Sequence, residues 1–109
     1  MSQTSEIHDA GDRSRFETEV EGHTATLDYR IEGGTIRLVH TEVPPALESR
    51  GIGSSLVRHA LESARSRGLE VWPQCPFVAA YIRQHPDYLD LVPASFPGRD
   101  RLESERGSW

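Results

Sequence analysis

The sequence has 109 residues, of which 36% are hydrophobic and 27% charged, which suffices for one modest core and excludes two large domains. Its net charge of −5 excludes the basic surface that general nucleic-acid binding needs, and its single cysteine excludes an internal disulfide. Because there is no apolar run of membrane-spanning length and no signal-like start, we expect a cytoplasmic protein without membrane contact, present as a monomer or weak homodimer.

Residues 1–14 are acidic and poor in large apolar side chains, so we expect a disordered arm. Three segments with apolar residues at every second position follow, at 16–20, 25–31 and 35–43, and short turns containing glycine join them. They predict a three-stranded antiparallel meander. In its third strand, strict alternation gives two faces, with Ile36, Leu38, His40 and Glu42 on one and Arg37, Val39, Thr41 and Val43 on the other.

The apolar spacing then becomes helical, from about residue 50 to residue 67, and Gly68 fits the C-terminal cap of that helix. A short strand at 69–72 follows and ends at Pro73. This order of strand, helix and strand favours a parallel strand pair with a right-handed crossover.

A second helix is expected from Pro76 to about Gln84, because proline suits a first helical turn and Pro86 ends the pattern. Residues 98–109 are polar and predict a loose or weakly docked tail. Residues 15–97 are therefore predicted to form one α/β (α+β) domain, in which a three-stranded antiparallel meander precedes a β-α-β unit and a second helix.

The segment Arg50-Gly51-Ile52-Gly53-Ser54-Ser55 lies between a predicted strand and an amphipathic helix. The first backbone N–H groups of a helix have no partner inside it and lie at its positive end, where they bind phosphate groups. Glycine lets an anion approach the backbone closely, and the serine hydroxyls add donors. The spacing alone also fits a flexible turn that starts a helix and binds nothing.

The wider pattern resembles the GNAT acyltransferase superfamily, with Val43-Pro44-Pro45 before the glycine turn and Cys75-Pro76-Phe77-Val78-Ala79-Ala80-Tyr81 after the next strand. More narrowly, it is similar to the small, minimal GNAT-like N-acetyltransferases that carry a cysteine before the last helix. The resemblance implies a compact GNAT-like fold and acetyl-CoA (coenzyme A) as cofactor, with its pyrophosphate on residues 50–55. Glu48 departs from the superfamily's motif, which has glutamine or arginine at that position.

The resemblance also implies that the third and fourth strands splay apart and that the pantetheine arm lies in the gap like an added strand. Backbone groups from Thr41 to Val43 would hold the arm, and Phe77 would pack beside it. The chain lacks the N-terminal helices with which many GNAT enzymes shape the acceptor pocket, so we expect an open and shallow acceptor site.

Acetylation of an amine needs a base for the amine proton and an acid for the departing thiolate. In direct transfer, His40 or Glu42 would be the base, unless both are ordinary polar residues on an open sheet face. In a covalent route, Cys75 would first take the acetyl group, helped by the helix N-terminus and by His40 as base, unless it is a buried packing thiol. The resemblance matches Tyr81 to the general acid of the family; packing of its ring is the alternative.

We therefore expect an acetyl-CoA-dependent N-acetyltransferase, an acyltransferase that moves an acetyl group to a primary amine directly or through acetyl-Cys75. The acidic surface suits a cationic small molecule, a polyamine or a basic protein segment as acceptor. The alternatives are a non-catalytic acyl-CoA-binding sensor or interaction module, and a structural domain that binds nothing. The histidine spacing predicts no metal site.

Overall fold

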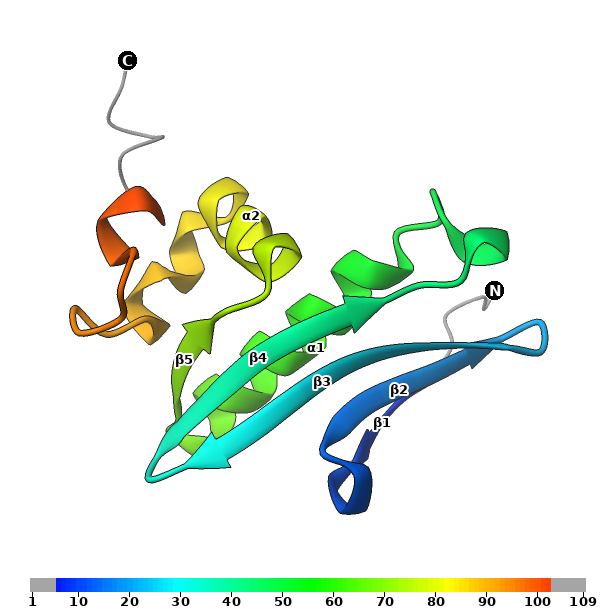
Figure 1. The fold of residues 1–109 in the computed structure, drawn as a ribbon, viewed down its shortest axis with the longest axis horizontal. Helices are drawn as coiled ribbons and strands as arrows, with labels where there is room; N and C mark the ends of the chain where they lie inside the picture. Colours follow the sequence, from blue (N-terminus) through cyan, green and yellow to red (C-terminus); the bar gives the residue numbers. More distant parts are fainter. Residues whose placement is uncertain (1–5, 103–109) are drawn as a thin grey trace.

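A computed structural model of the chain describes residues 6–102. Its elements are, in chain order, β1 (Ile7–Ala10), η1 (Gly11–Arg13), β2 (Arg15–Val20), β3 (His23–Glu32), β4 (Thr35–Glu42), η2 (Pro45–Leu47), α1 (Ile52–Arg67), β5 (Glu70–Pro73), α2 (Pro76–Gln84) and η3 (Pro86–Leu91). The strands form one sheet in the order β1-β2-β3-β4-β5, antiparallel from β1 to β4 and parallel between β4 and β5 (Figure 1). The predicted α/β fold is confirmed.

Two tight turns set the register of the meander. Glu21 and Gly22 have φ values of 54° and 81°, and Gly33 and Gly34 have φ values of 54° and 88°. Both central residues of each turn are thus left-handed, as in the two-residue hairpins whose twist matches that of the flanking strands. The β2–β3 and β3–β4 hairpins therefore lie where the turn residues predicted them.

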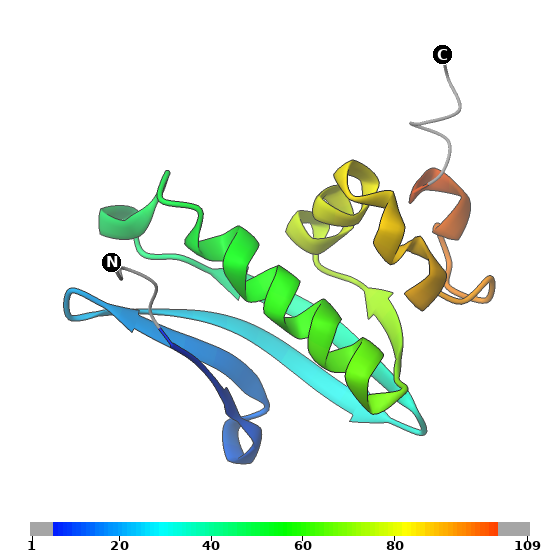
Figure 2. The ribbon, with the colours of Figure 1, turned by 180° about the vertical axis from the view of Figure 1, so that it is seen from behind.

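The core lies between α1 and the sheet face that α1 crosses (Figure 2). The apolar stripe of α1 is fully buried against this face, and consists of Leu56, Val57, Ala60, Leu61 and Ala64. Each large side chain buried in this way contributes about 1.5–3 kcal/mol. The helix ends at Gly68, whose φ of 71° lets its N–H bond the carbonyl groups of Ala64 and Arg65. No helix within residues 6–102 covers the opposite face of β1 to β4 (Figures 1 and 2), and none in that part of the chain is long and apolar enough to cross a membrane.

A β-bulge in β4 changes which of its side chains share a face, compared with the prediction. The register with β3 shifts so that Leu38 lies opposite Tyr29 and His40 opposite Asp28, which leaves Val39 as an extra residue. Beyond the bulge the alternation is inverted. The prediction that His40 and Glu42 share a face with Ile36 and Leu38 is therefore wrong, because both now lie on the open face. Thr41, opposite the fully buried Leu27, instead faces α1.

The N-terminal arm is not disordered where the structure describes it. Residues 7–10 form β1, an edge strand paired with β2, and the Thr18 hydroxyl donates a hydrogen bond to the Glu6 carbonyl at 2.9 Å. The Tyr29 hydroxyl, from β3, donates to Asp9 at 2.5 Å. Backbone pairing and polar contacts hold this strand, so it needs little apolar surface of its own. Residues 1–5 of the expected arm lie outside the described part of the chain.

The C-terminal segment is also docked as far as the structure follows it. Leu102 is only 2% exposed and belongs to the core. The Arg99 guanidinium donates hydrogen bonds to the carbonyl groups of Val92 and Leu89 at 2.9 and 3.3 Å. Of the two alternatives predicted for residues 98–109, the loose tail is wrong over residues 98–102, which are docked on the core. Residues 103–109 lie outside the described range.

Candidate functional site

A gap opens between β4 and β5 at the bulge. The parallel pairing ends at Leu38 and Pro73, and proline has no N–H with which to continue it. The Cys75 N–H then bonds the Leu38 carbonyl at 2.9 Å, after which the chain turns into α2. Strand β4 runs on to Glu42, and no strand within residues 6–102 pairs with its β5-side edge there. The splay implied by the family resemblance is confirmed.

The N-terminus of α1 lies at the open end of this gap. Gly51 is the N-cap residue, with a left-handed φ of 76°, and no side chain within residues 6–102 caps the helix. The N–H groups of the first turn therefore remain donors without a helical partner. Together with Val43 and Phe77, the glycine turn lines a hollow of about 270 Å³, to which it contributes Gly51, Gly53 and Ser54.

Glycine is required at positions 51 and 53 for different physical reasons. At Gly51 the backbone is left-handed and a Cβ would meet open space. At Gly53 the backbone is helical, but a Cβ would lie 3.0 and 3.1 Å from two ring carbons of Phe77 and 3.5 Å from Val43. The Phe77 ring therefore packs directly on Gly53. Gly53 is thus required for the close approach of α2 to α1.

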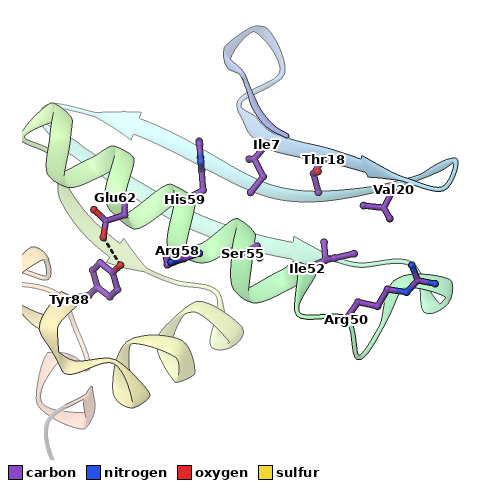
Figure 3. Close-up of a pocket in the computed structure, with 10 residues that line it drawn as sticks. All are labelled: Ile7, Thr18, Val20, Arg50, Ile52, Ser55, Arg58, His59, Glu62 and Tyr88. Carbon is purple, nitrogen blue, oxygen red and sulfur yellow. Dashed lines mark hydrogen bonds between the residues drawn. The ribbon is translucent and has the colours of Figure 1, made fainter. Parts of the chain in front are cut away.

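The remaining residues of the turn lie along a different surface. Arg50, Ile52 and Ser55 line a larger hollow of about 710 Å³ between α1 and strands β1 and β2, and Ile52 contributes to both hollows (Figure 3). Arg50 is held by Glu21 at 3.0 Å, an ion pair that raises the pKa of Arg50 and lowers that of Glu21. The predicted cofactor set is therefore divided between two sides of the α1 N-terminus.

Cys75 lies at the inner end of the gap, as the N-cap residue of α2. It is 4% exposed, and its Sγ lies 3.4 Å from the Oγ1 of Thr41, which the bulge has turned toward it. His40 and Glu42 lie on the opposite face of β4, with 61% and 74% of their side chains exposed and 3.9 Å between Nε2 and Oε1. The structure thus brings Cys75 together with Thr41, and does not bring it together with His40.

Tyr81 belongs to a cluster of aromatic rings at the junction of α1, α2 and η3. Its ring stacks on His85 with 4.0 Å between centroids and lies 6.2 Å from the ring of Tyr88. The His85 Nδ1 lies 2.8 Å from the Tyr81 carbonyl. Burial raises the pKa of Tyr81, so its hydroxyl stays protonated at neutral pH, as a general acid requires.

Sequence reasoning missed Arg58, which lines the larger hollow with Glu62 and Tyr88 (Figure 3). One signal for it was present. Arg58 follows Ser55, which lines the same hollow, by three residues, and side chains at that spacing share one face of a helix.

Comparison with known proteins agrees with this geometry. Residues 15–91 match the GCN5-related N-acetyltransferase family. Protein NATD1 of Xenopus tropicalis is 32% identical over 99 residues, covering 84% of this chain and 91% of that protein, and protein NATD1 of Mus musculus is 33% identical over 85 residues, covering 73% and 77%. The solution NMR structure of a GCN5-like protein from Staphylococcus aureus is similar with a TM-score of 0.65 at 25% identity, covering 81% of this chain and 87% of that one. The chain therefore belongs to the GCN5-related N-acetyltransferase family.

Proposed function

We propose that this protein is an acetyl-CoA-dependent N-acetyltransferase that acts on a primary amine. The observation that carries the proposal is the uncapped N-terminus of α1, which opens into the gap between β4 and β5. Backbone N–H groups at a positive helix end suit a pyrophosphate. The unpaired edge of β4 suits an extended arm that carries amide groups of its own.

The residues of the gap fit this cofactor. The hollow at the glycine turn has free donors on the α1 side and an apolar wall made by Phe77 and Val43. The carboxylate-bearing residue Glu48 lines the same hollow and opposes an anion there. Because Arg50 is engaged with Glu21, we assign the pyrophosphate mainly to the backbone of residues 51–54.

The bulge separates a cofactor side from an acceptor side. Thr41 and Cys75 lie on the α1 side of β4, and His40 and Glu42 lie on the open face. In direct transfer, the amine nitrogen forms a bond to the acetyl carbon, the bond from that carbon to sulfur breaks, and the CoA thiolate takes up a proton. His40 or Glu42 accepts the proton that the amine loses. The position of His40, on the face away from Cys75, favours direct transfer over a Cys75–His40 pair.

Calorimetry with acetyl-CoA tests the cofactor assignment. We expect wild type to bind and Gly53→Glu not to bind, because the new side chain would displace Phe77 and bring a carboxylate to the anion site. Gly11→Glu is the matched control, since a Cβ there meets its nearest atom, the Tyr29 Oη, at an ordinary 3.8 Å. Equal affinity for all three proteins would contradict the assignment.

Two further measurements separate the routes and the alternatives. A free-thiol assay with a panel of amines reports turnover, and binding without thiol release would indicate a non-catalytic acyl-CoA-binding module. Mass spectrometry after incubation with acetyl-CoA reports the covalent route, which requires an acetyl adduct in wild type that is lost in Cys75→Ala. We expect Cys75→Ala to retain turnover.

A further inference from the structure

Glu48 is held beside the small hollow at the glycine turn by the residues that flank it. Leu47 is fully buried, and the N–H of Glu48 bonds the Pro45 carbonyl at 3.2 Å, which ends η2. Ser49 follows with a left-handed φ of 72°, a conformation that residues other than glycine seldom adopt. The backbone of Glu48 is therefore fixed between a buried anchor and a tight turn, and the residue lines the hollow together with the first turn of α1.

Among the described residues, Glu48 brings the only charge to the wall of this hollow. The other residues that line it there are apolar, glycine or serine. The Glu48 side chain is exposed and has no ion pair and no hydrogen bond within residues 6–102. Arg50 does not neutralise it, because Glu21 holds the Arg50 guanidinium at 3.0 Å and Arg50 lines the larger hollow. The place to which we assign the diphosphate therefore combines backbone donors with an unneutralised carboxylate.

We propose that the charge of Glu48 limits how tightly the protein holds the diphosphate and so promotes release of CoA after the transfer. This inference rests on the proposed function. Acetyl-CoA and CoA carry the same diphosphate, so repulsion by Glu48 weakens the binding of both alike. Weaker binding shortens the time for which the product CoA occupies the site, and product release is the slow step of many enzymes. Glu48 thus lowers the affinity for the cofactor in exchange for its faster replacement.

Titration calorimetry with CoA and acetyl-CoA tests the proposal on wild type, Glu48→Gln, which loses the charge, and Glu48→Asp, which keeps it. Glu70→Gln is the matched control. Glu70 is also exposed and without an ion pair in the described chain, but it lies beyond the C-terminal end of α1, a helix about 24 Å long. At about 0.1 M salt, Glu48→Gln should bind both compounds about fivefold more tightly than wild type, and at about 1 M salt the difference should vanish. Glu48→Asp and Glu70→Gln should bind as wild type does.

The release role is measured by stopped-flow displacement of a fluorescent CoA analogue, which should dissociate more slowly from Glu48→Gln than from wild type. An equal dissociation rate would overturn that role. Equal affinities of wild type and Glu48→Gln, a difference that salt leaves unchanged, or the same gain in Glu70→Gln would overturn the proposal while leaving the proposed function standing. Weaker binding by Glu48→Gln would do so too, because Glu48 would then hold the cofactor directly or through a cation. Failure of both wild type and Glu48→Gln to bind CoA would overturn the proposed function and this inference together. Circular dichroism of each variant checks that it is folded.

Discussion

Gly51→Ala should lower the stability of the fold, whereas Gly53→Ala should mainly weaken the binding of acetyl-CoA. At Gly51, whose φ is 76° with open space around a Cβ, alanine has no clash but must adopt the left-handed conformation, which costs about 1–2 kcal/mol. At Gly53, the new Cβ would lie 3.0 Å from a ring carbon of Phe77, so the ring must retreat by a few tenths of an ångström to reach an ordinary contact distance. The ring is 44% exposed and can move.

The expected stabilities follow from these contacts. Displacing a half-exposed phenylalanine costs about 1 kcal/mol, and alanine regains up to about 1 kcal/mol of helix propensity over glycine. The free energy of unfolding of Gly53→Ala should therefore lie within about 1 kcal/mol of the wild-type value. Its affinity for acetyl-CoA should fall at least about fivefold, since the wall of the cofactor hollow has moved. Gly51→Ala should be clearly less stable.

Urea unfolding at constant m-value and calorimetry with acetyl-CoA measure the two effects on the same samples. Wild-type stability of Gly51→Ala would refute the role given to the left-handed turn. Loss of more than about 2 kcal/mol in Gly53→Ala would show that Phe77 cannot move, as in an overpacked core, and would refute the expectation that the ring gives way to the new Cβ.

Stability should fall as the pH rises from 10 to 12, because the pKa of Tyr29 is raised to about 12 by burial and its hydrogen bond to Asp9, and that of Tyr88 to about 12 by its hydrogen bond to Glu62 and burial. A group whose pKa is raised in the folded state stabilises the fold below its ordinary pKa, and this stabilisation is lost as the pH rises to the raised pKa. Urea midpoints that stay flat over this range, or a Tyr88→Phe variant with the same pH profile as wild type, would contradict the assignment. Leu102→Ala should cost about 2 kcal/mol in urea unfolding, since the side chain is buried, whereas a loose tail predicts no change. For the base, Glu42→Gln or His40→Gln should lower turnover by roughly 10²-fold at unchanged acetyl-CoA affinity. Thr24→Ser, on the same face of the sheet but on β3, is the control, and full turnover in both Glu42→Gln and His40→Gln would remove these residues from the mechanism.

Much of the fold was predictable because its signals are local. Period-two alternation, the glycine hairpins and the helical stripe from Leu56 to Ala64 each act over a few residues. The glycine turn and the positions of both helices followed from the same kind of signal. Strand β1 did not, because a four-residue edge strand is held by pairing with β2 and by the Tyr29–Asp9 contact, neither of which its own composition reveals.

The site was harder to predict because it depends on contacts between distant segments. The residues around Val39 alternate regularly in the sequence, and only pairing with β3 shows the bulge that sends His40 and Thr41 to opposite faces. In the same way, sequence cannot tell that Gly53 is covered by Phe77, which is 24 positions later. The candidate site residues could therefore be chosen from the sequence by residue type. Their distribution over two faces of β4 and two hollows could not be predicted from it.

Binding of a diphosphate by the first turn of α1 is the central claim, and an amide chemical-shift titration with CoA tests it most directly. The N–H resonances of Ile52, Gly53 and Ser54 should show the largest shifts, accompanied by those along the free edge of β4. Saturation by CoA with these amides unmoved would contradict the claim.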